Sequence, residues 1–221
     1  FAYGTGTLNV SDCTIKTTGN NSGGVMVTGG GILNANNLDV STSGNSSASI
    51  RSDRGGGILA VNGGTYVASG VGSPAIYSTA TIMVKDATLT STASEGAIVE
   101  GANSITFNNV NLTDTNTTLN GNSETYKNIF LYQSMSGDAS NGNATFEATD
   151  SNITTNNGDS IFVTNTTAII NLTNNTFTNT SGDFLRIQKG KWGTSGANGG
   201  NVILNLTNQK ISGNIIVDDI S

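Results

Sequence analysis

The sequence contains no histidine, one cysteine, one proline and one tryptophan, and only 11% of its residues are charged. Because histidine is the commonest general base and metal ligand, its absence leaves catalysis with little support. The single Cys13 cannot form an internal disulfide bond, so packing has to stabilise the fold.

Basic side chains are also few: Lys and Arg together number 9 against 15 Asp and Glu, which gives a net charge of -6. Without a basic stripe to neutralise phosphates, nucleic acid is not expected as a partner. No apolar run approaches the roughly 20 residues of a membrane-spanning helix, so no membrane insertion is expected. The abundance of Gly, Ser, Thr and Asn would indicate disorder if the apolar residues were scattered at random.

The apolar residues are instead ordered in a motif that returns about every two dozen residues. Each repeat is an alternating apolar run, an Asp or Asn, two further residues and another apolar residue. The Asp/Asn position is Asp12, Asn37, Gly63, Asp86, Asn109, Asp150, Asn174 and Asn208. The apolar residue three places later is Ile15, Val40, Tyr66, Leu89, Leu112, Ile153, Phe177 and Ile211.

A repeat of this length indicates stacked units that cannot bury their apolar faces alone. The period of two within each repeat is that of strands, and the connections are too short for a crossover helix. We therefore expect an all-β fold, a right-handed parallel β-helix of about eight three-strand coils, because parallel connections prefer the right hand. Residues 1–221 are expected to be a single β-helix domain and a piece of a longer chain. The Asp/Asn positions are expected to stack as a corner ladder of hydrogen-bonded side chains.

Three polar insertions interrupt the period, at residues 114–127, 134–143 and 189–200. The last two follow the third strand of their coils, so they should emerge from the same corner and form two walls of a groove. The floor of this groove is predicted to include Tyr132, Thr164, Arg186 and Gln188.

Acidic residues in the turns suggest a calcium site, since Ca²⁺ takes six to eight oxygen ligands. Asp159 and Asp183 occupy equivalent places on successive coils, where two carboxylates repel unless a cation or protons lie between them. Glu95 is close to the equivalent place two coils before Asp159, and Lys127 occupies the coil between them. The alternative is that all three are solvated turn residues.

Sugar recognition requires aromatic faces beside polar groups. Trp192 lies in a glycine-rich loop with Lys191, and it either stacks on a sugar ring or lies flat on the neighbouring coil and holds its own loop in place. We predict a carbohydrate site made of Trp192, Tyr132, Arg186 and Lys191, and Tyr77 is a further candidate.

Several segments carry a family resemblance. They are 28–31 (TGGG), 54–57 (RGGG), 70–79 (GVGSPAIYST), 94–101 (SEGAIVEG), 126–133 (YKNIFLYQ), 182–186 (GDFLR) and 192–193 (WG). With these segments the chain resembles secreted carbohydrate-binding domain proteins of anaerobic Gram-positive bacteria, which are related in fold to polysaccharide lyases. The resemblance implies a right-handed parallel β-helix that binds cellulose or pectin-like polymers and carries calcium.

The sequence therefore predicts a non-catalytic polysaccharide-binding or adhesive protein, secreted or on the bacterial cell surface, with extracellular polysaccharide as its partner. An alternative is a structural subunit whose copies stack end to end into a cell-surface filament or stalk. A polysaccharide lyase is a third and weaker alternative, for which only Arg51, Arg54 and Arg186 offer a cationic base.

Overall fold

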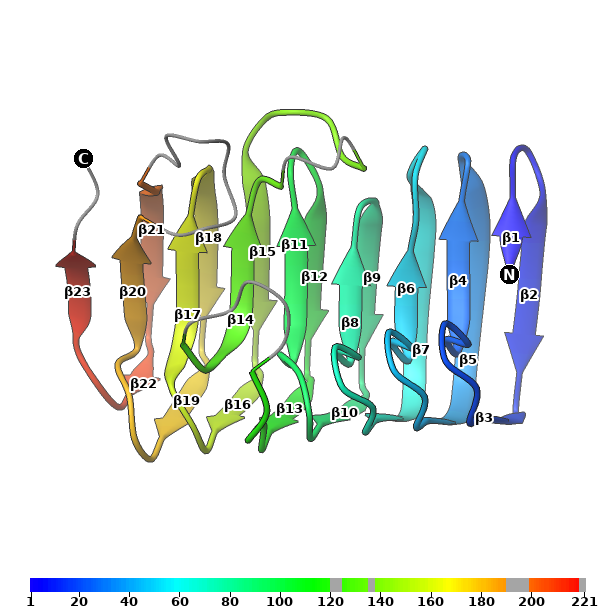
Figure 1. Cartoon of the computed structure of the whole chain (residues 1–221), viewed down its shortest axis with the longest axis horizontal. Coiled ribbons are helices and arrows are strands. Elements are labelled where there is room, and N and C mark those ends of the chain that lie inside the picture. The colour runs from blue at the N-terminus through cyan, green and yellow to red at the C-terminus, as the bar shows by residue number, and fades with distance from the viewer. Residues whose placement is uncertain (120–124, 135–137, 190–198, 219–221) are drawn as a thin grey trace.

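The computed structural model describes residues 1–119, 125–134, 138–189 and 199–218, and in these ranges it consists of β-strands and turns without a helix. The strands lie side by side across the long axis of the molecule and stack along it (Figure 1). One sheet contains nine strands: β1 (Ala2–Tyr3), β4 (Val25–Thr28), β6 (Ile50–Ser52), β8 (Ile76–Ser78), β11 (Ala97–Glu100), β14 (Lys127–Tyr132), β17 (Asp159–Thr164), β20 (Leu185–Gln188) and β23 (Ile215–Asp218).

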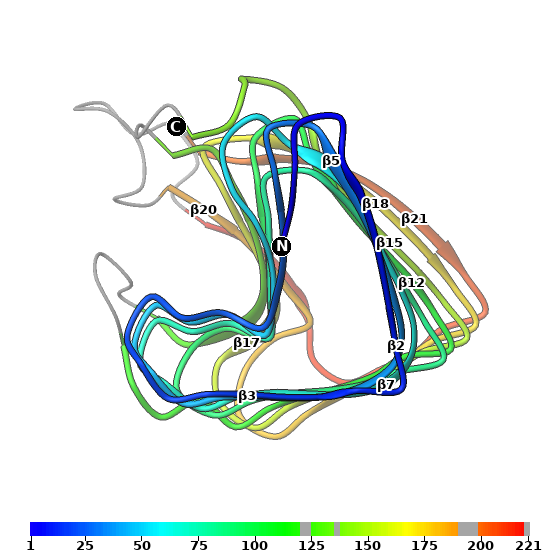
Figure 2. The same ribbon diagram turned by 90° about the vertical axis from the view of Figure 1, so that its right-hand side faces the viewer.

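The second sheet contains fourteen strands and is bent along its length. Its strands are β2 (Thr7–Ser11), β3 (Thr14–Thr17), β5 (Gly31–Thr42), β7 (Gly57–Ala68), β9 (Thr81–Lys85), β10 (Thr88–Ser91), β12 (Ser104–Asn108), β13 (Asn111–Asp114), β15 (Ala144–Thr149), β16 (Asn152–Thr155), β18 (Thr167–Thr173), β19 (Thr176–Asn179), β21 (Asn201–Thr207) and β22 (Lys210–Ile211). Viewed along the stack, successive windings of the chain superimpose (Figure 2). Parallel strands in curled sheets are compatible with a β-solenoid.

The windings lie in register, as the repeat predicts. Leu89 pairs with Leu112, Leu112 with Ile153, and Ile153 with Phe177, in parallel ladders. These side chains are almost completely buried. Because each of them lies directly over its equivalent in the next winding, burial of the apolar column stabilises the whole stack.

The Asp/Asn position forms the bend between the two halves of the larger sheet. Its residues have positive φ values, for example 53° at Asp12 and 49° at Asn37, a conformation that Asn, Asp and Gly tolerate best. Asn37 Nδ2 donates a hydrogen bond of 2.8 Å to Asp12 Oδ1 in the previous winding, and Asn109 does the same to Asp86 at 2.7 Å. The predicted corner ladder is confirmed at these positions.

A second corner, between the larger and the smaller sheet, carries short turns that project beside the nine-stranded sheet (Figure 2). Serine side chains link these turns between windings. The backbone N–H of Ser22 donates to Ser47 Oγ at 2.9 Å, and that of Ser47 donates to Ser73 Oγ at 2.8 Å. Ser47 and Ser73 are completely buried, so the turns form a fixed ridge. Within the described part of the chain, no helix has the length and apolarity needed to cross a membrane.

Candidate functional site

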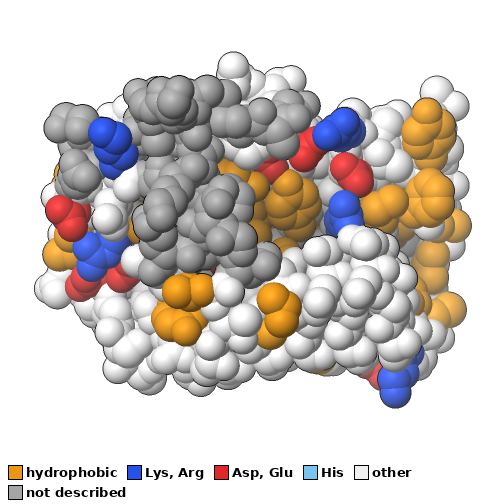
Figure 3. All heavy atoms as spheres, in the orientation of Figure 1, with side chains coloured by type: hydrophobic (Ala, Val, Ile, Leu, Met, Phe, Trp, Pro, Cys, Tyr) orange, Lys and Arg blue, Asp and Glu red, His pale blue; other side chains and the backbone are white. Residues whose placement is uncertain are grey.

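The outer face of the nine-stranded sheet carries a second apolar cluster, separate from the main core. It consists of Ile98, Phe130, Tyr132 and Phe162, with Tyr77 packed against it. These residues alternate with inward residues of β8, β11, β14 and β17, so they point away from the core. Figure 3 shows apolar side chains in the middle of this face, next to a group of acidic and basic ones.

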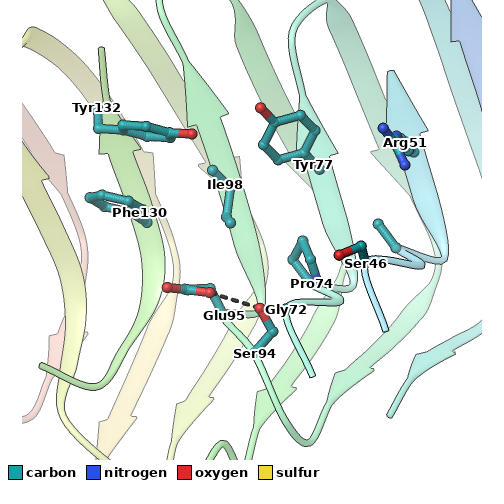
Figure 4. A pocket seen from close by; sticks show the side chains of 11 residues that line it. Ser46, Arg51, Gly72, Pro74, Tyr77, Ser94, Glu95, Ile98, Phe130 and Tyr132 are labelled. Carbon is teal, nitrogen blue, oxygen red and sulfur yellow. Dashed lines mark hydrogen bonds between the residues drawn. The ribbon is translucent and has the colours of Figure 1, made fainter. Parts of the chain in front are cut away.

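This face is hollowed into a pocket of about 200 Å³ between the cluster and the ridge of corner turns. The lining residues are Ser46, Ala48, Arg51, Gly72, Pro74, Tyr77, Ser94, Glu95, Ile98, Phe130 and Tyr132. Figure 4 shows the rings of Tyr77 and Tyr132 on either side of Ile98, with Arg51 at one end and Glu95 near the turns. The pocket therefore combines aromatic walls with a few polar groups, as ligand sites generally do.

Glu100 fixes the two tyrosine rings. Its carboxylate accepts hydrogen bonds from the hydroxyls of Tyr77, Tyr132 (3.0 Å) and Ser134. Burial raises the pKa of both tyrosines above the ordinary value, and the charge of Glu100 raises the pKa further. Both hydroxyls consequently remain donors at neutral pH, and the rings are held in place before any ligand arrives.

Phe130 supports Tyr132 from one side. Their rings are stacked, with centroids 4.4 Å apart and planes inclined by 5°. Lys127 Nζ lies 4.6 Å from the centroid of the Phe130 ring and 3.3 Å from Glu95 Oε1, so it is neutralised inside the wall of the pocket. Ser94 Oγ donates to Glu95 Oε2 at 2.7 Å.

The basic end of the pocket is formed by Arg51. Its Nη2 lies 3.1 Å from Asp53 Oδ2, and its buried Nε has no hydrogen-bond partner among the described residues. Arg54 forms an ion pair with Asp138, which joins this rim to the segment after β14. The Nε donor of Arg51 is thus buried and unsatisfied at this end of the pocket.

The structure brings together only part of the predicted carbohydrate site. Tyr132 and Tyr77 line the pocket, whereas Arg186 lies two windings further on than Tyr132 and is occupied by acidic partners. Trp192 and Lys191 lie outside the described residues, as does most of the loop expected to form the second wall of the groove. The expected groove lies on the side of β14 that faces β17 and β20. The pocket instead lies on the side that faces β11, β8 and β6, and the ridge of corner turns forms its wall.

The predicted metal residues fall into two separate clusters. Asp159 and Asp183 are neighbours, as expected, and Arg186 binds both: its Nε lies 2.8 Å from Asp159 Oδ2 and its Nη2 lies 2.9 Å from Asp183 Oδ2. Glu95 is paired with Lys127 instead. In the described part of the chain, no group of three or more His, Cys, Asp or Glu side chains is arranged to hold a metal ion. A calcium site stays a prediction.

Sequence reasoning missed Ile98, Phe130 and Glu100 as parts of this site. The available signal was the outward position of the third strand, which reads Tyr77, Ile98, Phe130 and Phe162 on successive windings where polar residues are expected. Comparison with protein-family models, with curated proteins and with solved structures gives no match for this chain.

Proposed function

We propose that this chain is a non-catalytic extracellular polysaccharide-binding protein of the bacterial cell surface, and that a glycan lies in the pocket on the outer face of the nine-stranded sheet. The proposal includes a right-handed parallel β-helix of about eight coils and membership of the carbohydrate-binding family that the sequence resembles. Calcium is proposed as an additional stabilising ion, and Trp192 and Lys191 as further contacts of the glycan.

The observation that supports this proposal best is the pocket itself. Tyr77 is its most accessible aromatic side chain, and the hydrogen bond to Glu100 fixes its ring. An apolar ring face beside polar groups suits a sugar, which has an apolar face and a rim of hydroxyls. Glu95 and Arg51 are ion-paired with Lys127 and Asp53, which favours binding over acid–base chemistry.

A glycan array probed with the purified chain tests the proposal, followed by titration of the best polysaccharide. We expect Tyr77→Ala to weaken binding by about tenfold, which corresponds to about 1.4 kcal/mol. Tyr77→Phe should retain most of the affinity, because the ring remains. Tyr3→Ala is the matched control, since Tyr3 is 70% exposed on the same sheet, three strands away from Tyr77, and does not line the pocket. Saturable binding that Tyr77→Ala leaves unchanged would exclude this pocket, and no binding to any glycan would exclude the function.

A second candidate is end-to-end assembly, favoured by the two end windings. At one end Phe1 and Tyr3 are exposed, and at the other Ile203, Ile215 and Val217 are more than half exposed. Strands β1 and β23 each have one unpaired edge, which can pair with a second copy. Light scattering and electron microscopy should then show polymers that Ile215→Lys abolishes, whereas a strictly monomeric wild-type chain would contradict assembly.

A further inference from the structure

Three ionisable side chains are withdrawn from water beneath the pocket, where the chain passes from β13 to β14. Glu95, Asp114 and Lys127 are 7%, 0% and 2% exposed, respectively. Burying charges is costly unless they are closely paired, and among the described residues this cluster contains two acids and one base. Such a cluster either needs a compensating proton or can lose its charges by reacting.

The geometry brings an amine next to a carboxyl group. Lys127 Nζ lies 3.3 Å from Glu95 Oε1, and Ser94 Oγ donates a hydrogen bond of 2.7 Å to Glu95 Oε2. The Lys127 ammonium also lies 4.6 Å and 5.4 Å from the ring centroids of Phe130 and Phe162. The nucleophile, a donor for the carboxyl oxygen and a cover of aromatic rings that excludes water are therefore present together.

Asp114 supplies a proton carrier beside this pair. Its Oδ1 accepts a hydrogen bond of 2.9 Å from the backbone N–H of Asn116, and its buried Oδ2 has no partner within the described ranges. Burial raises the pKa of Asp114 to about 8, and although Lys127 lowers the pKa, Glu95 raises it. The Asp114 carboxyl group thus holds a proton at neutral pH, next to the charges of Glu95 and Lys127.

We propose that Lys127 and Glu95 become joined by an isopeptide bond. The Lys127 ammonium first gives a proton to the Glu95 carboxylate, and the neutral amine that results attacks Glu95 Cδ. A C–N bond forms, and the bond from Cδ to the protonated oxygen breaks. That oxygen leaves as one water molecule, with the proton that it received and a second proton from the nitrogen. The two opposite charges disappear together, so neither charge balance nor oxidation state requires a co-reactant. Asp114 acts as a positioning and proton-exchanging residue, and Ser94 stabilises the negative oxygen that develops on Glu95.

Such a bond would tie two successive windings together. Glu95 precedes β11 and Lys127 begins β14, the neighbouring strand of the sheet. The closed loop would contain residues 95–127, including the insertion between β13 and β14. Covalent closure of a loop restricts the unfolded chain, as a disulfide does, and a chain with one cysteine has no disulfide of its own.

Mass spectrometry of the intact, denatured protein tests the bond directly. We expect the wild-type chain to be lighter than its sequence by one water molecule, and trypsin to fail to cut after Lys127. After cleavage at Asp114, the fragments that contain Glu95 and Lys127 should remain joined. A folded wild-type chain with the full sequence mass, cut by trypsin after Lys127, would overturn the proposal.

Three variants separate this bond from other losses of water. Lys127→Met should restore the full mass, whereas Lys85→Met, which removes an exposed lysine, should keep the deficit. Asp114→Asn should lower the yield of the bond while circular dichroism shows that the chain is folded. A mass deficit of one water molecule that persists in Lys127→Met would also overturn the proposal, because it would come from another reaction, such as cyclisation of an Asp side chain. This test is independent of the outcome of the glycan measurements.

Discussion

Two clusters of ionisable side chains lie at the same corner of the stack, on neighbouring windings, and they are neutralised in different ways. In the first cluster, Asp159 and Asp183 share the guanidinium of Arg186, whose side chain is 23% exposed. In the second cluster, Lys127 is paired with Glu95, and both are buried. The clusters are adjacent because Lys127 pairs in register with Asp159. An Arg presents a planar fork that satisfies two carboxylates, whereas a Lys is a compact charge that can also react. The first cluster is thus a stable ion-pair network, and the second has an unsatisfied acid.

The largest expected effect concerns that unsatisfied acid, Asp114. Burial raises its pKa from the ordinary 3.8 to about 8, so between these pH values the folded chain holds a proton that the unfolded chain has released. The stabilisation is therefore complete below about pH 4 and is lost as the pH rises towards 8, by at most about 1.4 kcal/mol per pH unit. Urea unfolding across this range should show the slope.

Asp114→Asn should remove most of this dependence, because the amide does not titrate. The control is Ser91→Ala at the equivalent buried place on the preceding winding, which removes no titratable group and should leave the slope unchanged. A wild-type chain whose stability is flat between pH 4 and 8 would contradict the assignment of a protonated Asp114.

Removing the base from the buried cluster should have the next largest effect. Lys127→Ala removes the proposed covalent link and leaves the Glu95 carboxylate buried without a cation, and we expect the free energy of unfolding to fall by at least about 3 kcal/mol. Lys85→Ala breaks an exposed pair with Asp86 and should cost less than about 1 kcal/mol. Equal losses in the two variants would remove the distinction between buried and exposed pairs.

Arg186→Gln tests whether Arg186 occupies the place that calcium was predicted to take. Without calcium, the loss of hydrogen bonds to two carboxylates should destabilise the chain by about 1 to 3 kcal/mol. With calcium, the melting temperature of the variant should recover, since a hard cation between Asp159 and Asp183 removes their repulsion. If calcium stabilises the wild type as much as the variant, Arg186 and calcium do not compete for these carboxylates.

The smallest effect is expected for Arg186→Lys, which keeps the charge but loses the fork. A single ammonium cannot reproduce the two separate contacts to Asp159 and Asp183, so a loss of about 1 kcal/mol is expected. Differential scanning calorimetry of Arg186→Lys, run together with Arg186→Gln, measures this loss of stability. Full stability in Arg186→Lys would show that charge alone matters at this cluster.

The buried architecture could be predicted from the sequence because its signal is strictly periodic. The column of Leu89, Leu112, Ile153 and Phe177 and the left-handed bends at the Asp/Asn positions both follow from residue type and spacing. The adjacency of Asp159 and Asp183 followed from the same register. These features depend on neighbours one winding apart, which the repeat specifies.

The candidate site was harder to predict because it depends on turn geometry and on side-chain direction. The ridge beside the pocket requires the positive φ values of Ser46 and Gly72, which no spacing rule specifies. Arg186 was predicted on the floor of an open groove, because the sequence does not show that its side chain binds the carboxylates of Asp159 and Asp183. Asp114 did carry a signal, since it takes the inward place that Ser91 and Thr155 take on neighbouring windings.

The corner ladder also has a direction, because a carboxylate cannot donate a hydrogen bond. Each amide donates towards the amino-terminal end of the stack, as Asn174 does to Asp150 and Asn208 to Asn174. An Asp therefore ends the relay on its amino-terminal side, and Gly63, without a side chain, leaves a gap. The ladder is divided into short independent segments, so thermal fraying that opens one segment need not travel through this column into the next.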